Sequence, residues 1–310
     1  MVVLTLVTAL LLALVTQPSS YERRLAEWRK SRVAEAAGPE GWTTVVALHW
    51  LKPGPTRVGS MEGIEARLPA SAPPLIGTLR VDGEAVSFET ASGVDVTSSG
   101  ARVSTTAMMP DKTTLHVGTY TLQVIARAGR LGLRVRDRQS AARAGFKGID
   151  YFPVSADARV KARFVPFHIT NTATVINVIG DPVKFQSPGQ LVFMRKGVEY
   201  RLDALYETPE KKDLWIIFRD RTSGVTTYPA GRYLHVPLPT IGQVDLDFNL
   251  AYNPPCAFTE FATCPIPPRQ NWLKIPIEAG EKNYHFEGPK PRASRTKPVA
   301  SSFGRLRPEA

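Results

Sequence analysis

The chain has 310 residues, of which 43% are hydrophobic and 22% are charged, so it can form a packed core and is not globally disordered. Its net charge of +11 is concentrated at the C-terminus: from Lys290 onward there are six basic residues and one acidic residue, and without them the net charge falls to +6. No zinc-finger, RNA-recognition or helix-turn-helix signature accompanies this charge, so it does not indicate specific nucleic-acid binding.

The first 20 residues have the pattern of an export signal. An almost unbroken apolar run from Val2 to Val15 is followed by small polar residues at 16–20. The run has the length of a signal-peptide core and is short for a bilayer span of about 20 residues. It has no basic residue before it and no clear cleavage site, which leaves an uncleaved anchor or a misassigned start codon as alternatives. We expect residues 1–20 to be a signal peptide, the protein to be exported to the periplasm or the exterior, and no membrane span after removal of the leader.

One helix is predicted directly after the leader, over residues 21–37. Ser19 and Glu22 form a capping-box pattern, and Gly38-Pro39 should end the helix. Its apolar face holds Tyr21, Leu25, Trp28 and Val33.

From Thr56 onward, apolar and polar residues alternate with the period of two that is typical of strands with one buried face. The clearest runs are Leu79–Phe88 around an Asp82-Gly83 hairpin turn, Tyr120–Ala126, Leu131–Val135, Val160–Phe164, Val175–Ile179, Gln190–Phe193 and Leu214–Phe218. We predict a mainly β fold, an antiparallel sandwich or barrel with one N-terminal helix. A boundary near residues 145–153 divides it into halves over 21–145 and 146–288, an unbroken sheet being the alternative. Residues 289–310 are predicted to be disordered.

Polar side chains gather with prolines between Gly224 and Glu281, where long irregular sequence favours a functional loop. We propose these candidates for binding a small polar ligand: Arg232, Asp247, Asn249, Tyr252, Asn253, Asn271, Glu278 and Glu281. His235, close to Arg232, is the histidine of most interest. Alternatively, the amides and carboxylates satisfy the backbone of a buried loop.

Two other functional classes remain open. Asp247, Glu278 or Glu281 could be the acid and base of a hydrolase, or the protein could be a structural envelope or interaction module. The chain has no nucleophile elbow, zinc-protease motif, phosphate-binding loop or dinucleotide fingerprint, so no cofactor and no reaction are predicted.

Two predicted strands carry three basic side chains each on one face, with Arg130, Arg134 and Arg136 on the first and Arg159, Lys161 and Arg163 on the second. If the strands are neighbours, Arg134, Arg136, Lys161 and Arg163 could hold an anionic ligand. The alternative is a solvated outer face with acidic neighbours.

Cys256 and Cys264 are the only cysteines. In an exported protein such a pair predicts a disulfide, which here would pin the loop that contains it. Zinc needs about four ligands, and no histidine lies between or beside these two, so no metal site is predicted.

Several strings resemble a bacterial and archaeal family known as domain of unknown function 1684. In chain order they include GWTTVVALHWLKPG, LGLRVRD, FKGIDYFPV, TTYPAGRYL, DFNLAYNPPCAF, ATCPIPP and IEAGE. The resemblance runs from about Tyr21 to Glu281 and departs at His49, where the family usually has a Gly-Leu-x-Trp-Leu-like run. It implies no activity, because the family is uncharacterised. It does imply that the family motif includes Asn249, Asn253, Cys256, Cys264, Asn271, Glu278 and Glu281.

A second resemblance covers residues 54–104, whose strand rhythm is similar to that of forkhead-associated domains. Those domains are β-sandwiches that bind phosphothreonine through an Arg and a Ser. The family's Ser-Arg-x-His stretch and Asn-Gly-Thr loop are absent here. The resemblance therefore supports a sandwich more than phosphopeptide binding.

Overall fold

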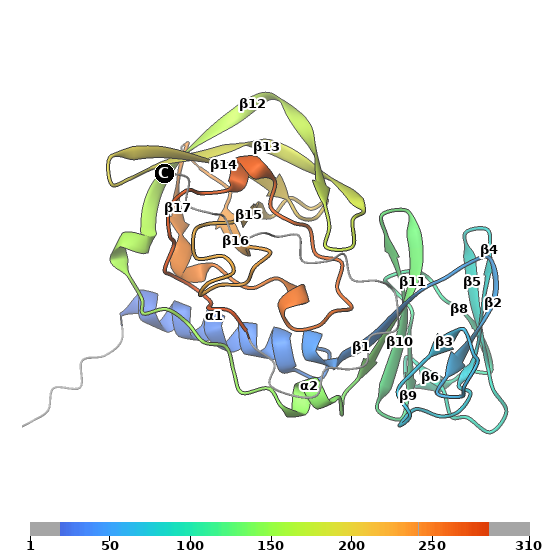
Figure 1. Ribbon diagram of the computed structural model, residues 1–310. Helices are drawn as coiled ribbons and strands as arrows, with labels where there is room; N and C mark the ends of the chain where they lie inside the picture. The colour runs from blue at the N-terminus through green and yellow to red at the C-terminus, as the bar shows by residue number, and fades with distance from the viewer. Residues whose placement is uncertain (1–18, 241, 285–310) are drawn as a thin grey trace, which may run out of the picture.

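The computed structural model describes residues 19–240 and 242–284 (Figure 1). The apolar run of the predicted leader and the predicted disordered tail at 289–310 lie outside these residues. The described chain is mostly β with mainly antiparallel pairing and has one long helix at its N-terminal end, so the predicted fold class is confirmed. Within the described ranges, no helix has both the length and the apolar character needed to cross a membrane.

Helix α1 (Ser20–Ala37) begins and ends where the sequence predicts. The Ser19 Oγ accepts a hydrogen bond from the Glu22 backbone N–H at 3.1 Å, and the Glu22 carboxylate accepts one from the Ser19 N–H at 2.7 Å, which completes the capping box. Val33, predicted on the buried face, is 39% exposed, and its neighbour Arg32 is buried. The helix directs this charged side chain inward because polar groups of the C-terminal half bind it there.

Two sheets packed face to face form the N-terminal half. Their strands are β1 (Val45–Trp50), β2 (Gly54–Gly59), β3 (Ala66–Arg67), β4 (Gly77–Asp82), β5 (Ala85–Thr90), β6 (Thr97–Ser98), β7 (Ala101–Arg102), β8 (Thr105–Ala107), β9 (Thr114–Val117), β10 (Tyr120–Arg127) and β11 (Arg130–Asp137). One sheet has the order β1-β11-β10-β9-β6-β7 and the other β3-β2-β4-β5-β8. Buried side chains from both sheets, such as Phe88 and Leu122, form one core between them, which makes this half a sandwich.

The predicted hairpin at Asp82-Gly83 is present. Asp82 pairs with Ala85, so Gly83 and Glu84 form a two-residue turn. Gly83 has a φ of +58°, the left-handed backbone that such turns require and that glycine adopts without strain.

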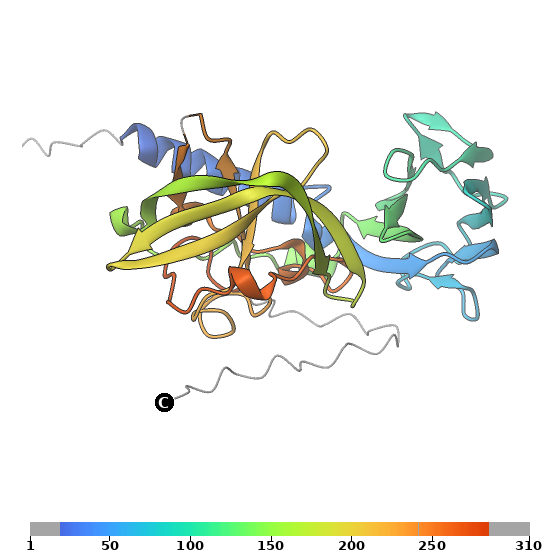
Figure 2. The ribbon, with the colours of Figure 1, turned by 90° about the horizontal axis from the view of Figure 1, so that it is seen from above.

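The C-terminal half is a single antiparallel sheet that curls into a nearly closed barrel (Figures 1 and 2). Its strands are β12 (Arg159–Ile176), β13 (Pro182–Arg195), β14 (Val198–Tyr206), β15 (Asp213–Phe218), β16 (Arg232–Pro237) and β17 (Gln243–Asp247). Their order is β16-β15-β14-β13-β12-β17, and their inward side chains, including Phe193, Ile216 and Leu246, form the barrel core.

The first hairpin of the barrel is longer than the sequence predicts (Figure 2). The runs Val160–Phe164 and Val175–Ile179, expected as two strands, both begin within β12, and the second leaves the strand after Ile176. The pairing of β12 with β13 shifts register between Pro166 and Asn171. Proline has no N–H to donate to the strand ladder, so the regular strand pattern of the sequence is interrupted at Pro166. The sequence therefore predicts two strands where the structure has one.

Loops with short helical turns connect and cover the two halves. The turns are one α-helix, α2 (Ala141–Ala144), and five 3₁₀-helices: η1 (Trp42–Thr44), η2 (Ala156–Ala158), η3 (Phe248–Leu250), η4 (Pro255–Ala257) and η5 (Arg269–Asn271). Helix α1 precedes the sandwich in the sequence but lies along the C-terminal half (Figure 1). Side chains of β15 and β16 and of the loop that follows β17 form a separate apolar cluster on the outside of the barrel, with Trp28 of α1 packed against it.

Candidate functional site

Asp247 and Asn249 are buried and bonded within the chain. The Asp247 carboxylate accepts hydrogen bonds from the Tyr21 hydroxyl at 2.8 Å and the Asn249 N–H at 3.0 Å, and it lies 3.2 Å from the Arg159 guanidinium. Burial, helped by the bond to Asp247, raises the pKa of Tyr21 to about 12. The Asn249 side chain bonds both backbone groups of Ser155. Together they tie α1 and the start of the C-terminal half to the end of β17.

Asn253 and Glu281 form a second buried group with α1. The Glu281 carboxylate, fully buried, accepts hydrogen bonds from the Arg32 Nε and the Asn253 N–H, both at 2.7 Å. Arg32 also donates to the Asn253 carbonyl at 3.0 Å, and the Asn253 amide donates to the Lys282 carbonyl at 2.7 Å. Burial raises the pKa of Glu281, while the charge of Arg32 acts in the opposite direction. This group fixes the helix on the family motif.

The remaining candidates of the motif occupy different places. Arg232 is 1% exposed, forms an ion pair with Asp220 at 2.7 Å and donates to backbone carbonyls at 277 and 279. Asn271 accepts from the Asp203 N–H at 2.7 Å and donates to its carbonyl at 3.0 Å. Glu278 is exposed. None of these residues lines the cavity described below, and their contacts match the alternative in which they satisfy an irregular backbone.

Tyr252 differs from the other candidates because its hydroxyl belongs to a polar chain near the cavity. The Trp215 Nε1–H donates a hydrogen bond to the Tyr252 hydroxyl oxygen at 3.3 Å. The same oxygen lies 2.8 Å from the His235 Nε2. The His235 Nδ1 lies 3.1 Å from the Asp213 carboxylate. Burial raises the pKa of Tyr252 well above its ordinary value, so the hydroxyl stays protonated. Both ring nitrogens of His235 have polar partners in this network.

A cavity of about 180 Å³ lies between the two halves. The sandwich contributes Arg127 and Arg134, and the barrel contributes Trp215 and Tyr233. The remaining lining residues come from η1, from the chain after β14 and from the loop after β17: Trp42, Glu207, Pro255, Ala262, Thr263, Cys264 and Pro265. The cavity therefore exists only where both halves and the motif loop meet.

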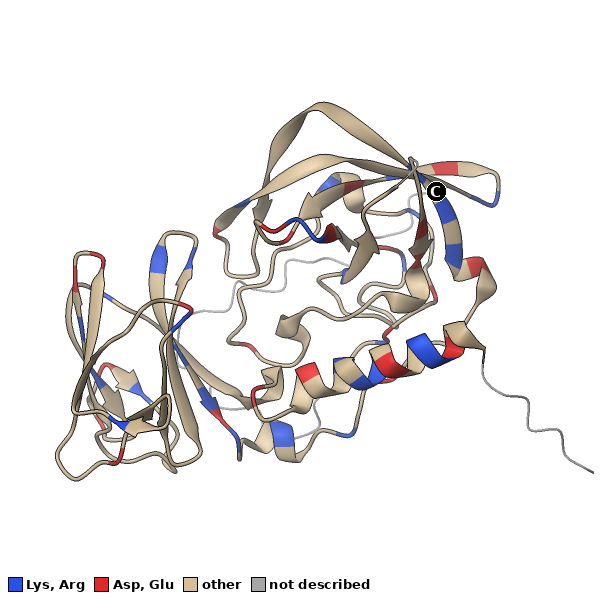
Figure 3. Cartoon of the chain, turned by 180° about the vertical axis from the view of Figure 1, so that it is seen from behind, with Lys and Arg blue, Asp and Glu red and all other residues tan. Residues whose placement is uncertain are grey.

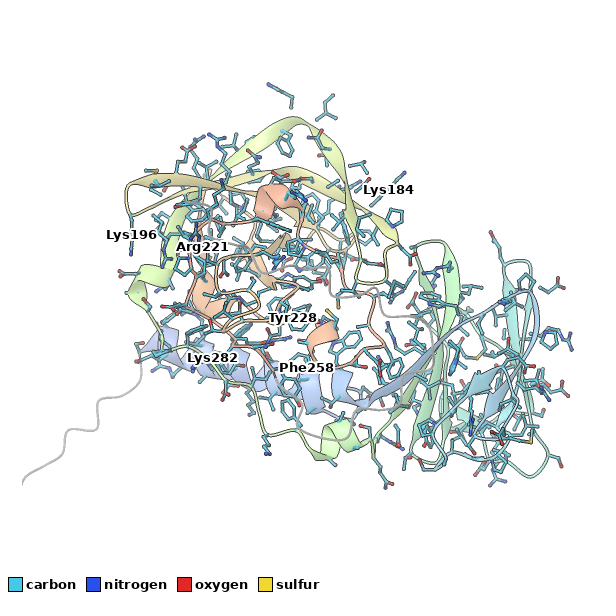
Figure 4. All side chains as sticks on the ribbon, in the orientation of Figure 1. Lys184, Lys196, Arg221, Tyr228, Phe258 and Lys282 are labelled. Carbon is cyan, nitrogen blue, oxygen red and sulfur yellow. The ribbon has the colours of Figure 1, made fainter. Side chains whose placement is uncertain are left out.

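Several hydrogen bonds hold this loop against the barrel side, among them one from the Tyr233 hydroxyl to the Pro265 carbonyl at 2.7 Å. The Tyr228 hydroxyl, labelled in Figure 4, donates to the Cys256 carbonyl at 2.9 Å. Phe258, labelled on the same loop, is buried and its ring lies 4.9 Å from that of Tyr284. The loop is thereby anchored at the edge of the cavity without regular secondary structure.

Arg134 is the most unusual residue of the cavity. It is 5% exposed, and within the part of the chain that the structure describes it makes no hydrogen bond and no ion pair. Its guanidinium lies 5.2 Å from the centre of the Trp42 ring. Burial, with the neighbouring charges of Arg136 and Arg127, lowers the pKa of Arg134 to about 10, so it remains cationic at neutral pH. Arg127, by contrast, is paired with Asp111 at 2.9 Å.

Glu207 supplies the opposite charge at the rim. Its side chain is 45% exposed, and its nearest ionic partner is His235, at 3.5 Å. Partial burial raises the pKa of Glu207, with Asp213 and Glu35 acting in the same direction and His235 against them. Sequence reasoning missed Glu207, because it is an isolated acid in a turn and carries no motif.

The cysteine prediction needs correction. Cys256 and Cys264 are both free thiols in the structure, and the Cys264 Sγ accepts a hydrogen bond from the Cys256 backbone N–H at 3.1 Å instead of forming a disulfide. Cys264 is 5% exposed and burial raises its pKa well above the ordinary value, which keeps the thiol protonated. The loop is held by hydrogen bonds and packing and needs no covalent link.

The two basic strands lie in different sheets, β11 in the sandwich and β12 in the barrel, so their arginines and lysines do not share a surface (Figure 3). Lys161 is 73% exposed and pairs with Asp245 at 2.6 Å, and Arg163 is exposed. Arg134 and Arg136 are instead covered to different degrees. Of the four predicted anion-binding residues, Arg134 alone lines the cavity. Among the described residues no group of three or more His, Cys, Asp or Glu side chains is arranged to hold a metal ion.

Comparisons with known proteins place the chain among uncharacterised relatives. None of the curated proteins matches it. A solution NMR structure of an uncharacterised protein of Haloarcula marismortui is 33% identical, with 45% of this chain and 78% of that one covered and a TM-score of 0.39.

Two structures of FHA domains also match. One comes from a study of phosphothreonine-dependent FHA interactions, with 18% identity, 30% of this chain and 96% of that one covered and a TM-score of 0.21. The other is the FhaA FHA domain in complex with an intracellular domain of another protein. It is 17% identical, with 29% of this chain and 97% of that one covered and a TM-score of 0.21.

The family match falls on the barrel and the loop that follows it. Residues 144–282, which contain every motif residue from Asn249 to Glu281, match the model described as protein of unknown function, DUF1684. Two of the strings that suggested this family, DFNLAYNPPCAF and IEAGE, contribute to the two buried groups around Asp247 and Glu281, whereas GWTTVVALHWLKPG and LGLRVRD lie outside the matched residues. The chain belongs to the DUF1684 family.

Proposed function

We propose that this protein binds a small anionic metabolite in the cavity between its halves, with Arg134 as the counter-ion. The observation that carries the proposal is a guanidinium 5% exposed, lining a cavity and without a polar partner among the described residues. A buried charge without a partner costs several kcal/mol. A bound carboxylate or phosphate would offset that cost, and a guanidinium can bind such a group through two parallel hydrogen bonds.

The rest of the lining supports a ligand with an apolar part. Trp42, Trp215 and Tyr233 face the cavity beside two prolines. The Trp215 ring is held edge-on to Tyr233, with centroids 4.9 Å apart, so this wall is rigid. A volume of about 180 Å³ is well below the roughly 300–1,000 Å³ of sites for drug-sized molecules and close to the about 150 Å³ that holds benzene. The ligand is therefore a small metabolite.

The test is calorimetric titration of the full chain with acetate, butyrate, benzoate and phosphate. We expect at least one of these anions to bind. Arg134→Gln should weaken its binding by about tenfold or more, which corresponds to a loss of about 1.4 kcal/mol or more of binding free energy. Arg136→Gln is the matched control, since Arg136 lies on the same strand and does not line the cavity. Absence of binding, or equal binding by Arg134→Gln, would contradict the proposal.

A stability measurement separates loss of binding from loss of folding. Because Arg134 is a buried charge without a partner in the unliganded protein, Arg134→Gln should unfold at the same temperature as wild type or a higher one. A large decrease would mean that Arg134 is needed for folding and would remove the reason for assigning it to a ligand.

We also propose that the protein is exported, on the strength of the apolar run at residues 2–15. Fractionation of cells that produce the full chain, with mass spectrometry of the mature N-terminus, tests this proposal. Full-length chain retained in the cytoplasm would contradict it.

A further inference from the structure

The cavity carries two charges of opposite sign that do not neutralise each other. Arg134 lies on β11 of the sandwich, and Glu207 follows β14 of the barrel. Both line the cavity, and within residues 19–240 and 242–284 no ion pair joins Glu207 to Arg134 or to Arg127. Two opposite charges on one small cavity would pair directly if they could reach each other. Their separation leaves a position for a ligand that carries both complementary charges.

Glu207 lies among other carboxylates on its side of the cavity. Its nearest ionic partner is His235, whose Nε2 lies 3.5 Å from the Glu207 carboxylate. The two ring nitrogens of His235 also lie close to other groups, Nε2 at 2.8 Å from the Tyr252 hydroxyl and Nδ1 at 3.1 Å from the Asp213 carboxylate. The titratable groups that act on Glu207 are therefore His235 and two carboxylates, Asp213 and Glu35. Such a site favours a cation.

The apolar wall is also suited to a cation. Trp42, Trp215 and Tyr233 line the same cavity as Glu207. Aromatic faces attract an ammonium group, by about 0.5–1 kcal/mol at exposed sites and more where water is excluded. The rim near Glu207 thus offers a carboxylate and aromatic rings, whereas Arg134 offers a buried guanidinium.

Resting on the anion site proposed above, we infer that the natural ligand is a small zwitterion, an amino acid or a related compound, with its carboxylate on Arg134 and its ammonium group on Glu207. Because Arg134 is 5% exposed and the Glu207 side chain 45% exposed, the carboxylate enters first and the ammonium group stays at the rim. The volume limits the ligand to about six to nine non-hydrogen atoms, by comparison with benzene in a cavity of about 150 Å³.

The experiment compares zwitterions with partners that lack one charge. The full chain is titrated with the ω-amino acids from glycine to 6-aminohexanoate, and each is matched with the carboxylate and the amine of the same length. We expect one chain length to bind best and at least about tenfold more tightly than its matched carboxylate. Glu207→Gln should reduce the affinity for that amino acid to the level of the carboxylate. Glu210→Gln, an exposed acid on the same turn that does not line the cavity, should leave it unchanged.

The outcomes separate the two proposals. If the carboxylates bind as well as the amino acids and Glu207→Gln changes neither, the zwitterion inference is wrong and the anion site remains. If no carboxylate or amino acid binds, or if Arg134→Gln binds them all as wild type does, the anion site and the inference that rests on it both fail. An amine that binds as tightly as its amino acid, independently of Arg134, would also overturn both.

Discussion

Three arginines are almost equally buried and differ in what they contact. Arg232 is 1% exposed and Arg32 and Arg134 are 5% exposed. Arg232 is paired with Asp220, and Arg32 with Glu281. Burial alone would lower the pKa of Arg32, but the charge and hydrogen bond of Glu281 outweigh it, so the pKa is raised. Arg134 has no such partner in the described chain, and this difference is the basis for proposing a ligand at Arg134 and a structural role for the other two arginines.

We predict that Arg232→Met destabilises the protein by about 3–5 kcal/mol, because it leaves the carboxylate of Asp220 buried and uncompensated. Asp220 is 4% exposed, so solvent does little to screen its charge. Urea unfolding followed by tryptophan fluorescence measures the loss. Arg201→Met removes an exposed pair with Glu199 and should cost no more than about 1 kcal/mol. Similar losses in the two variants would contradict the prediction.

The two thiols should differ in reactivity. Cys256 is half-buried, whereas Cys264 is 5% exposed with a raised pKa. Since the thiolate is the reactive form, a thiol reagent should label Cys256 faster in the folded protein and both cysteines in urea. Peptide mapping after labelling without reductant measures this order. Fewer than two reactive thiols per chain in urea would show that the pair is bonded to each other after all.

At the scale of elements, α1 and the family motif stabilise each other. The helix brings Tyr21 to Asp247 and Arg32 to Glu281, on the two sides of the motif. Neither contact could form within the matched segment, because both donors lie outside residues 144–282. The helix therefore completes the C-terminal half, and its polar inward side explains why Val33 is left exposed.

Tyr21→Phe tests the first of these contacts through its pH dependence. The pKa of Tyr21 is raised from 10 to about 12 in the folded protein, so its contribution to stability is complete below pH about 10 and is lost as pH rises toward about 12. We expect the variant to be about 1 kcal/mol less stable than wild type near neutral pH and the difference to disappear over that alkaline range. Urea unfolding at a series of pH values measures it.

Tyr206→Phe is the matched control, because the Tyr206 hydroxyl makes no hydrogen bond with the described residues. It should match wild type near neutral pH. A difference between wild type and Tyr21→Phe that grows above pH about 10 would mean that the sign of the linkage is wrong.

The described chain has three hydrophobic clusters, namely the sandwich core, the barrel core and the cluster on the outside of the barrel, and the cavity lies between the two halves. The sandwich core and the barrel core share no residues, and the contacts across the cavity are made by irregular chain. Arg130 of β11 adds one direct link, an ion pair with Asp181 at the turn after β12.

Hydrogen exchange should show that α1 unfolds with the barrel and not with the sandwich. Phe88→Ala and Phe248→Ala each remove a large buried ring, 1% and 0% exposed, from the sandwich core and the barrel core respectively. Each should cost about 3–5 kcal/mol locally. Exchange of the amides at residues 20–37, measured by mass spectrometry, should accelerate in Phe248→Ala and remain as in wild type in Phe88→Ala. The reverse pattern would assign the helix to the sandwich.

The sequence by itself determined the features that depend on near neighbours. The capping box joins Ser19 to Glu22, and the hairpin turn depends on Gly83, so each is decided within a few residues. Alternation with a period of two likewise predicts strands wherever one face is buried. The motif strings identified the family because they are long and specific, although they did not reveal what each polar side chain contacts.

Only the tertiary structure decided which charges are paired. Arg32 and Glu281 are 249 positions apart, and the residues around Arg134 come from η1, both halves and the motif loop. In the sequence Arg134 looks like Arg130 and Arg136, because alternation says which face a side chain lies on and not what covers that face. The cost of a buried charge depends on the groups that surround it in space. The candidate site therefore emerges only when chain segments distant in sequence come together.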